Sequence, residues 1–593
     1  MINKRIEQFR ELMKKHNLSL YVIPTADDHQ SEYISDYYKT RVYMSGFTGS
    51  AGTMVITQND AAVWADGRYH VQAENQLKGT CISLYKMGLD GVPSVMQQVE
   101  DWTHAGDVIG FDGTTMSADW GKLLSDIAER KHASVCYEID LVNEVWTDRP
   151  ELPDGKIWEF DVQYTGKDRI DKLSDVRASM KANKADVHVL ADLTEIAWLF
   201  NLRGSDVAHT PVFLAFSIIT EDECVLYVDL KKVDNQLKET LKNQKIEVKD
   251  YPEFMNDLKN IKNKTVWCDG LKCHHAMMSV LREENQILDK PSSVALAKAC
   301  KNEVELKNIR LAHEKDGAAF VKFMIWLKQN VDKGNITEIS ASDTLEKMRR
   351  EMGAMDLSFN TIAAYNDHGA MMHYSSTKQT DVQLKDGLFL VDSGGQYLEG
   401  TTDITRTFAI GQISDQWKMY CTTVLKSMLR LARAKFLYGC SGLSLDILAR
   451  GPIWDMDLDY QCGTGHGVGH LLSVHEGPQA FRWYVSFGRH EDTRLEEGMI
   501  LTDEPGLYFE GEFGCRLENE LVVTKGVKNM YGQFMQFETI TYAPIDLDIL
   551  NTDLLDSVEK KQLNDYHQMV YEKLCPYLND EEQEALRFYT RAV

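Results

Sequence analysis

The chain has 593 residues, of which 43% are hydrophobic and 26% charged, a composition typical of a folded protein with several domains. Asp and Glu number 90 against 65 Lys and Arg, which gives a formal net charge of −25. Nucleic acids and anionic membranes are bound by cationic surfaces, so this balance argues against both kinds of partner. We therefore expect neither a nucleic-acid-binding protein nor a membrane protein.

The cysteine content indicates a reducing compartment. The eleven cysteines are scattered, their number is odd, and no C-x-x-C motif occurs, so a disulfide framework is not indicated. The first 24 residues are rich in charge and lack the apolar core of a signal peptide. No uncharged apolar run approaches the ~18 residues that a membrane-spanning helix requires. We therefore predict a cytoplasmic protein.

A helix–strand pattern occurs twice along the chain. Apolar periodicity over residues 6–16 predicts a helix, and a short strand is expected over 20–23. A similar helix and strand return 167 residues later, around 176–181 and 187–190. This repeat predicts two related α/β domains, although two amphipathic helix–strand units can also arise by chance.

Turn-rich stretches and changes of pattern mark further boundaries. Residues 148–155 are polar and rich in turn formers, and a second break falls at 289–293. Apolar residues within 320–327 then share one face of a predicted long helix. Short strands with Gly-rich turns are expected over about 358–524, and a helical, partly acidic tail is expected from about Asp553.

Two aspartates in a predicted hairpin are the first candidates for chemistry. If the hairpin is centred between Tyr397 and Leu398, Asp392 and Asp403 are directly opposed and share a face. Two ionised carboxylates at such a short distance repel each other, so the pKa of one must rise or cations must lie between them. The pair therefore indicates a metal site or an acid/base dyad, and the alternative is a pair that flanks a turn and points to solvent.

A second pair of acids has the same form. Glu504 and Glu518 are symmetric about Gly511, a residue type suited to a turn. A hairpin centred there would again bring two carboxylates together.

A segment rich in Gly and His, residues 463–470, lies between the two pairs. It contains neither G-x-G-x-x-G nor G-K-[ST], so a phosphate-binding loop is not indicated. His466 and His470 are four apart, but the Glu of a helical zinc motif is missing and the glycines oppose a helix. The remaining interpretation is a strand or turn in which Gly lets one imidazole approach a site closely.

The charges of these groups balance two divalent cations. Two such ions carry a total charge of +4. The four carboxylates carry −4 and the imidazole is neutral; these groups belong to Asp392, Asp403, Glu504, Glu518 and His466. This set suits a dinuclear site with metals about 3.5–4 Å apart, which would acidify a bridging water. Oxygen-rich ligation with one imidazole favours Mn²⁺, Zn²⁺ or Co²⁺.

The same five residues, in this order, resemble the metal ligands of the pita-bread metallopeptidases. Further segments narrow the resemblance to the three-domain Xaa-Pro aminopeptidases (aminopeptidase P): residues 45–53, 66–69, 301–306, 391–394 and 563–567. The resemblance extends over essentially the whole chain. It implies a mixed α/β (α+β) fold with creatinase-like domains at 1–155 and 156–297, a pita-bread catalytic domain at 298–540 and a helical extension at 541–593.

The resemblance also implies an activity. The chain would be a cytosolic homodimeric metallo-aminopeptidase that acts on peptides with proline in second position, through a hydroxide bridging two divalent metals, most often Mn²⁺. Asp392 would bind one metal, His466 and Glu504 the other, and Asp403 and Glu518 would bridge both. Glu504 would also be the general base. The alternatives are a prolidase that prefers dipeptides and a peptide-binding protein without catalysis on the same fold.

Further roles come from the same resemblance. His373 and His475 would contact the substrate and the developing oxyanion, Arg68 would contact the substrate, and Arg516 would lie beside the bridging Glu and contribute to substrate binding. One position departs from the family, because relatives usually carry His where this chain has Cys462. A thiol is a poorer hydrogen-bonding group than imidazole, which affects the expected proline selectivity and turnover.

Overall fold

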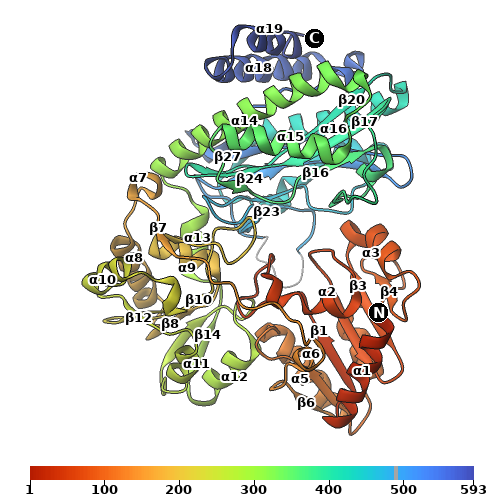
Figure 1. Ribbon diagram of the computed structural model, residues 1–593. Coiled ribbons are helices and arrows are strands. Elements are labelled where there is room, and N and C mark those ends of the chain that lie inside the picture. Colours follow the sequence, from red (N-terminus) through yellow and green to blue (C-terminus); the bar gives the residue numbers. More distant parts are fainter. Residues whose placement is uncertain (486–491) are drawn as a thin grey trace. The chain divides into compact units, whose positions relative to one another are not determined.

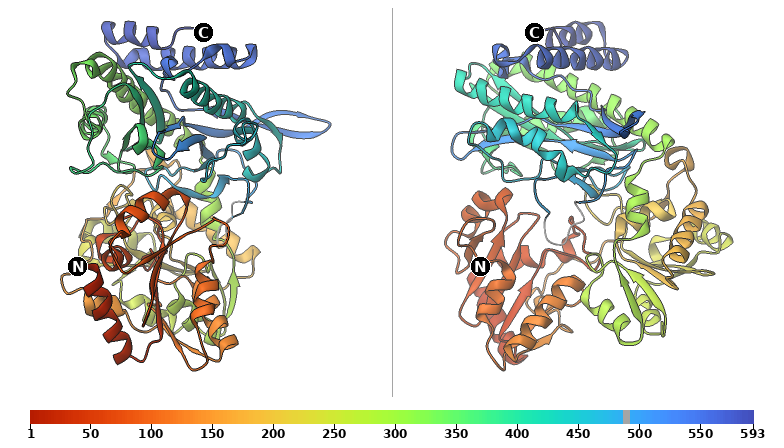
Figure 2. Two further views of the ribbon diagram at one scale, coloured as in Figure 1. Left: turned by 90° about the vertical axis from the view of Figure 1, so that its right-hand side faces the viewer. Right: turned by 180° about the vertical axis from the view of Figure 1, so that it is seen from behind.

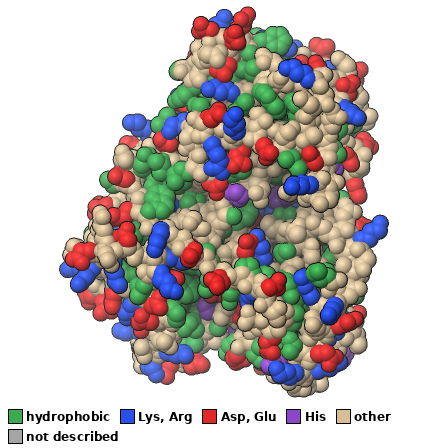
Figure 3. All heavy atoms as spheres, viewed as in Figure 1, with side chains coloured by type: hydrophobic (Ala, Val, Ile, Leu, Met, Phe, Trp, Pro, Cys, Tyr) green, Lys and Arg blue, Asp and Glu red, His purple; other side chains and the backbone are tan. Residues whose placement is uncertain are grey.

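The structure is a computed structural model, and it describes residues 1–485 and 492–593. The chain forms two compact units, one of residues 1–162 and 167–295 and the other of residues 163–166 and 296–593. Within the described residues, no helix combines the length and apolar character needed to cross a bilayer. On the face shown in Figure 3, Lys and Arg side chains are interspersed with Asp and Glu.

The first unit contains two six-stranded sheets of matching topology (Figure 1). The first sheet has the order β4 (Ser83–Lys86), β3 (Ala61–Ala65), β2 (Thr53–Thr57), β1 (Leu20–Ile23), β5 (Val108–Phe111), β6 (Ser134–Cys136). The second has the order β12 (Glu247–Lys249), β11 (Cys224–Val228), β10 (Ala215–Thr220), β8 (Val187–Leu190), β13 (Thr265–Cys268), β14 (Gln286–Asp289). Helix α1 (Ile2–Lys15) precedes β1 as α8 (Arg169–Ala182) precedes β8, both with an offset of 167 residues. The predicted repeat is confirmed, because chance would not reproduce a whole strand order.

Helices cover both faces of the first sheet. Alternate residues of β1 point to opposite faces, as the pleat of a strand requires. Tyr21 and Ile23 pack with Phe9 of α1 in one apolar cluster. Leu20 and Val22 pack on the other face in a cluster that includes residues of α4 (Val95–Trp102) and α5 (Ala118–Lys131). The result is a three-layer α/β domain.

The second unit is built on two main antiparallel sheets. One sheet has the order β16 (Ile362–Tyr365), β17 (Gly387–Ser393), β20 (Ile404–Ile410). The other has the order β21 (Lys435–Leu437), β28 (Gly532–Thr539), β27 (Asn519–Asn529), β24 (Ile500–Asp503), β22 (Gly465–Gly467), β23 (Glu476–Phe481). Two short additions are the hairpin of β25 (Gly506–Phe509) and β26 (Phe513–Arg516), and the ladder of β15 (Asp356–Leu357), β18 (Gly395–Tyr397) and β19 (Gly400–Thr401).

Long helices pack on both faces of these strands (Figures 1 and 2). α14 (Glu303–Asn330) and α15 (Glu338–Glu351) pack with Phe389 of β17, whereas α16 (Asp415–Ala432) packs with the adjacent Leu388, which points to the opposite face. Asn302 and Glu305 form a capping box at the start of α14, which satisfies backbone N–H groups that a helix end otherwise leaves unpaired. The predicted long helix is confirmed, since Phe320 and Leu327 pack on Phe389 and other strand residues in one apolar cluster.

The C-terminal tail is helical, as predicted. It consists of α18 (Ser557–Leu574) and α19 (Asp580–Tyr589), each begun by a capping box. Val570, Leu574 and Leu586 of this tail pack against Val321 of α14. The tail is therefore part of the core of the second unit.

Candidate active site

Asp392 and Asp403 lie close together, but not in the predicted register. Asp392 is paired with Thr405 across β17 and β20, and Tyr397 with Gly400 at the hairpin end. The turn therefore consists of Leu398 and Glu399, one residue later than the symmetric centre assumed from the sequence. The prediction of direct opposition was wrong, and the two aspartates are diagonal neighbours displaced by two residues.

The predicted symmetry of the two glutamates is confirmed. Gly506 pairs with Arg516 and Asp503 with Asn519, so the strands on both sides of the glutamates share one register centred on Gly511. Gly511 has φ +75°, a left-handed conformation that favours glycine. Glu504 lies between β24 and β25, and Glu518 lies between β26 and β27. The shared register therefore places the two glutamates opposite each other.

His466 reaches this group from β22. Its backbone N–H donates to Thr502 Oγ1 at 3.0 Å, and its Nδ1 lies 2.9 Å from the carbonyl oxygen of Gly467. Donation from Nδ1 leaves the Nε2 lone pair toward the acids, 3.3 Å from Glu504 Oε1 and 3.6 Å from Asp403 Oδ2. A Cβ at Gly465 would lie 1.9 Å from the carbonyl oxygen of Thr502. The interpretation of a Gly-packed strand that admits one imidazole is therefore confirmed.

The clustered carboxyl groups raise each other's pKa values. Burial, reinforced by Glu518 and Asp392, raises the pKa of Asp403 well above its ordinary value. Burial and the neighbouring Glu504 raise that of Glu518, and burial raises the pKa of Glu504 to about 7. Acids held in this way are costly when ionised unless cations accompany them.

Divalent cations fit the arrangement of these groups. One ligand atom from each of Asp403, His466 and Glu518 lies within 4.8 Å of the others. Oδ1 of Asp392 and Oδ1 of Asp403 are buried and accept no hydrogen bond from the described residues. A buried carboxylate oxygen without a donor is the kind of atom that a metal ion satisfies.

Arg516 is buried beside Asp392. Its Nη2 lies 2.5 Å from Asp392 Oδ2, and its Nη1 donates to the Tyr508 hydroxyl at 2.7 Å. Its Nε donates to Thr405 Oγ1 at 3.2 Å, and that hydroxyl donates to Glu518 Oε2 at 2.7 Å. Arg516 is thus joined to Asp392 directly and to Glu518 through Thr405, and its substrate role stays a prediction.

The two other predicted histidines are half-buried. The ring of His475 lies edge-on to that of His466, with centroids 4.3 Å apart. His373 follows Met372, whose carbonyl oxygen accepts from Arg516 Nη2 at 3.3 Å. Both positions border the acidic cluster, and the roles of both residues in substrate binding stay predictions.

Cys462 is a neutral thiol in this surrounding. Burial, with the nearby Glu504 carboxyl as a second cause, raises the pKa of Cys462 to about 12. The side chain therefore stays protonated at neutral pH and offers only a weak hydrogen-bond donor.

Arg68 belongs to the first unit. Its Nε and Nη2 each lie 2.9 Å from an oxygen of Asp66, which makes a bidentate pair. Its predicted contact with substrate stays a prediction.

Sequence reasoning missed the polar residues that hold the acids. Thr405 and Glu520 lie near the starts of β20 and β27, two positions after the predicted ligands Asp403 and Glu518. Thr405 donates to Glu518, and Oε1 of Glu520 accepts from the backbone N–H of Asp403 at 2.8 Å. The polar residue two positions after each of these predicted ligands was the available signal.

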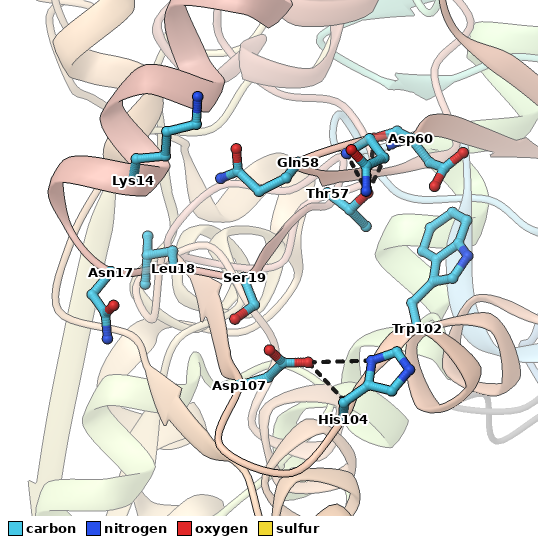
Figure 4. Close-up of a pocket in the computed structure, with 11 residues that line it drawn as sticks. Lys14, Asn17, Leu18, Ser19, Thr57, Gln58, Asp60, Trp102, His104 and Asp107 are labelled. Carbon is cyan, nitrogen blue, oxygen red and sulfur yellow. Dashed lines mark hydrogen bonds and ion pairs between the residues drawn. The ribbon is translucent and has the colours of Figure 1, made fainter.

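A separate depression of about 600 Å³ lies in the first unit (Figure 4). Lys14, Trp102, His104 and Asp107 are among its lining residues, and His104 is turned toward Asp107. None of the predicted site residues lines it. The candidate site is therefore defined by its chemistry and not by this depression.

Comparisons with family models cover most of the chain. Residues 5–141 and 148–305 match two models of the creatinase/prolidase N-terminal domain. Residues 307–525 match metallopeptidase family M24, and residues 533–593 match the C-terminal region of peptidase M24.

Full-length relatives agree with these matches. The chain is 37% identical to "Aminopeptidase P1" of Arabidopsis thaliana, with 99% of both chains covered. It is 35% identical to "Xaa-Pro aminopeptidase 1" of Dictyostelium discoideum, with 97% of this chain and 94% of that one covered. The crystal structure of X-prolyl aminopeptidase from Caenorhabditis elegans, described as a cytosolic enzyme with a di-nuclear active site, superposes with a TM-score of 0.95 at 31% identity and full coverage of both chains. The predicted fold class, creatinase-like domains followed by a pita-bread domain, is confirmed. The chain belongs to metallopeptidase family M24 and, within it, to the Xaa-Pro aminopeptidases.

Proposed function

We propose that the protein removes the N-terminal residue of peptides whose second residue is proline, with two divalent cations held by Asp392, Asp403, His466, Glu504 and Glu518. The observation that carries the proposal is the convergence of four acids and one imidazole, in which a buried oxygen of each aspartate has no donor among the residues that the structure describes. Two divalent cations, when bound, balance the four negative charges and lower the pKa of a water molecule toward neutrality.

The residues of the chain supply the remaining steps. Glu504 would accept a proton from the attacking water and pass it toward the departing amine. His475 and His373 donate to the scissile carbonyl oxygen as negative charge develops there, and such a donor typically contributes about 3–4 kcal/mol. Arg516 orients Asp392, because its guanidinium lies against that carboxylate.

Cleavage assays test the proposal. With added Mn²⁺, Arg-Pro-Pro should be cleaved and Arg-Ala-Ala should not, and equal rates or activity without any metal requirement would contradict it. Comparison of Ala-Pro with longer peptides separates an aminopeptidase from a dipeptidase. Metal analysis of Asp403→Asn against the parent tests the ligand set directly, since a binding protein without catalysis would be purified metal-free and keep its function in this variant.

Three further properties belong to the proposal. Mn²⁺ is the proposed resident metal, supported by an oxygen-rich ligand set with a single imidazole. A cytoplasmic location is supported by the description of the Caenorhabditis elegans relative as cytosolic. A homodimer follows from the family resemblance, and light scattering of the purified protein tests it.

A further inference from the structure

The relative position of Asp392 and Asp403 is not fixed by their own hairpin alone. The register of β17 and β20 displaces the two aspartates by two residues, so no ladder pair joins them. The strand pairing holds the backbone of Asp392 and of Ile404 beside Asp403. Two buried polar contacts add to it, and each lies against a residue of helix α14.

Glu520 on β27 contacts the backbone of Asp403. Its Oε1 accepts from the Asp403 N–H at 2.8 Å, and its Oε2 lies 3.3 Å from Nε2 of His313 on α14, a contact without hydrogen-bond geometry. Both side chains are fully buried. The backbone N–H of Glu520 donates to Thr541 Oγ1 at 2.8 Å, which anchors Glu520 itself. The carboxylate therefore fixes the chain where Asp403 enters the site.

Arg349 on α15 makes the corresponding contact beside Asp392. Its Nη2 donates to the carbonyl oxygen of Ser393 at 3.2 Å. Its guanidinium is paired with Asp316 of α14 at 2.7 and 3.0 Å, and the Tyr397 hydroxyl donates to the same carboxylate at 2.8 Å. This contact is independent of Glu520, so it holds the Asp392 side of the hairpin when Glu520 is changed.

Both supports come from one face of α14. His313 and Asp316 are three residues apart, a spacing that places them side by side on a helix. Buried ion pairs and buried polar groups contribute little net stability compared with apolar packing of the same volume. Their presence behind both aspartates therefore points to a geometric role.

We propose that Glu520 is a positioning residue that, with His313 behind it, holds the backbone of Asp403 so that the site binds divalent cations tightly. The inference rests on the proposed function, because it assumes that the site binds such ions. Groups that orient metal ligands from outside typically change metal affinity about 10–100-fold when they are removed.

Titration of the metal-stripped, full-length protein with Mn²⁺, with free Mn²⁺ followed by electron paramagnetic resonance, tests this inference. In Glu520→Leu the acceptor of the Asp403 N–H is lost, and the midpoint should rise about 10–100-fold. In Glu520→Gln an amide oxygen can still accept, and the midpoint should stay near that of the parent. Glu520→Asp keeps the charge but is shorter by one methylene, so it should behave like Glu520→Leu and serves as the second variant if the latter does not fold.

Asp546 provides the matched control. It is also a buried carboxylate that accepts a β20 backbone N–H, that of Ala409 at 2.9 Å, six residues beyond Asp403. Asp546→Leu should lower the thermal stability and leave the Mn²⁺ midpoint unchanged.

Three outcomes would overturn the inference: a parent-like midpoint in the Leu or Asp variant of Glu520, equal losses in the Gln and Leu variants, or the same shift in Asp546→Leu. A parent protein that binds no Mn²⁺ would instead contradict the proposed function, on which the inference rests.

Discussion

Thr405→Val removes one hydroxyl from the candidate site and leaves all five predicted ligands in place. The Thr405 side chain is fully buried, donates to Glu518 Oε2 at 2.7 Å and accepts from Arg516 Nε at 3.2 Å. A hydrogen bond to a charged group contributes about 1.5–3 kcal/mol. Cation binding requires ionised Glu518, so loss of this donor should weaken Mn²⁺ binding by about 10–100-fold at 1.4 kcal/mol per factor of ten.

The assay is a Mn²⁺ titration of the metal-stripped variant, with thermal unfolding measured in parallel. Thr407→Val is the matched control, because Thr407 is buried on the same strand and its hydroxyl, among the described residues, bonds the backbone of Arg516 alone, at 2.9 and 3.2 Å. The control should lose about 1 kcal/mol per lost hydrogen bond in stability without a change in Mn²⁺ affinity. Parent-like affinity in Thr405→Val, or equal weakening in both variants, would refute the reasoning.

Three further predictions concern the same unit. Burial raises the pKa of Glu504 from 4.5 to about 7, so between these pH values the folded metal-free protein binds more protons than the unfolded chain. Its free energy of unfolding should therefore fall as the pH rises through this range, and the melting temperatures with and without Mn²⁺ should differ most above it. A metal-free melting temperature that rises over this range would contradict the raised pKa. Gly465→Ala should prevent Mn²⁺ binding, since its Cβ would lie 1.9 Å from the Thr502 carbonyl oxygen, and a variant that keeps the parent's metal content would show that β22 is not constrained there. Asn302 is the N-cap of α14, and its side chain accepts from the N–H groups of Val304 and Glu305. Asn302→Ala should therefore lower the free energy of unfolding by about 1 kcal/mol in denaturant unfolding. An unchanged denaturant midpoint would show that the cap does not stabilise the protein.

Much of the fold could be predicted from local sequence patterns. The helix and strand of each N-terminal repeat were predictable because apolar periodicity reports which face is buried, and both strands are buried throughout. The long helix was predictable for the same reason. The strand order of the two sheets depends on contacts between residues far apart in sequence, which no local pattern encodes.

In the candidate site, too, some features could be predicted from local sequence and others depend on contacts between distant residues. Glu504 and Glu518 were predictable as a facing pair because Gly511 marks the turn and the register continues unbroken on both sides. Asp392 and Asp403 were assigned the wrong register, because nothing in the residues Leu398 and Glu399 distinguishes a two-residue turn from its neighbours. The buried partners on α14 could not be predicted, since they depend on how that helix packs against the strands.

The single register centred on Gly511 has a consequence for how this chain can vary in length. The registers of β24–β27 and β25–β26 share this centre. Inserting or deleting one residue between Pro505 and Leu517 would therefore shift the register, and Glu504 would no longer face Glu518. The hairpin of β27 and β28 already contains a register shift and ends in the exposed side chains of Met530 and Tyr531. Among related chains, length changes should therefore accumulate at the tip of that hairpin and be excluded from the one that carries the glutamates.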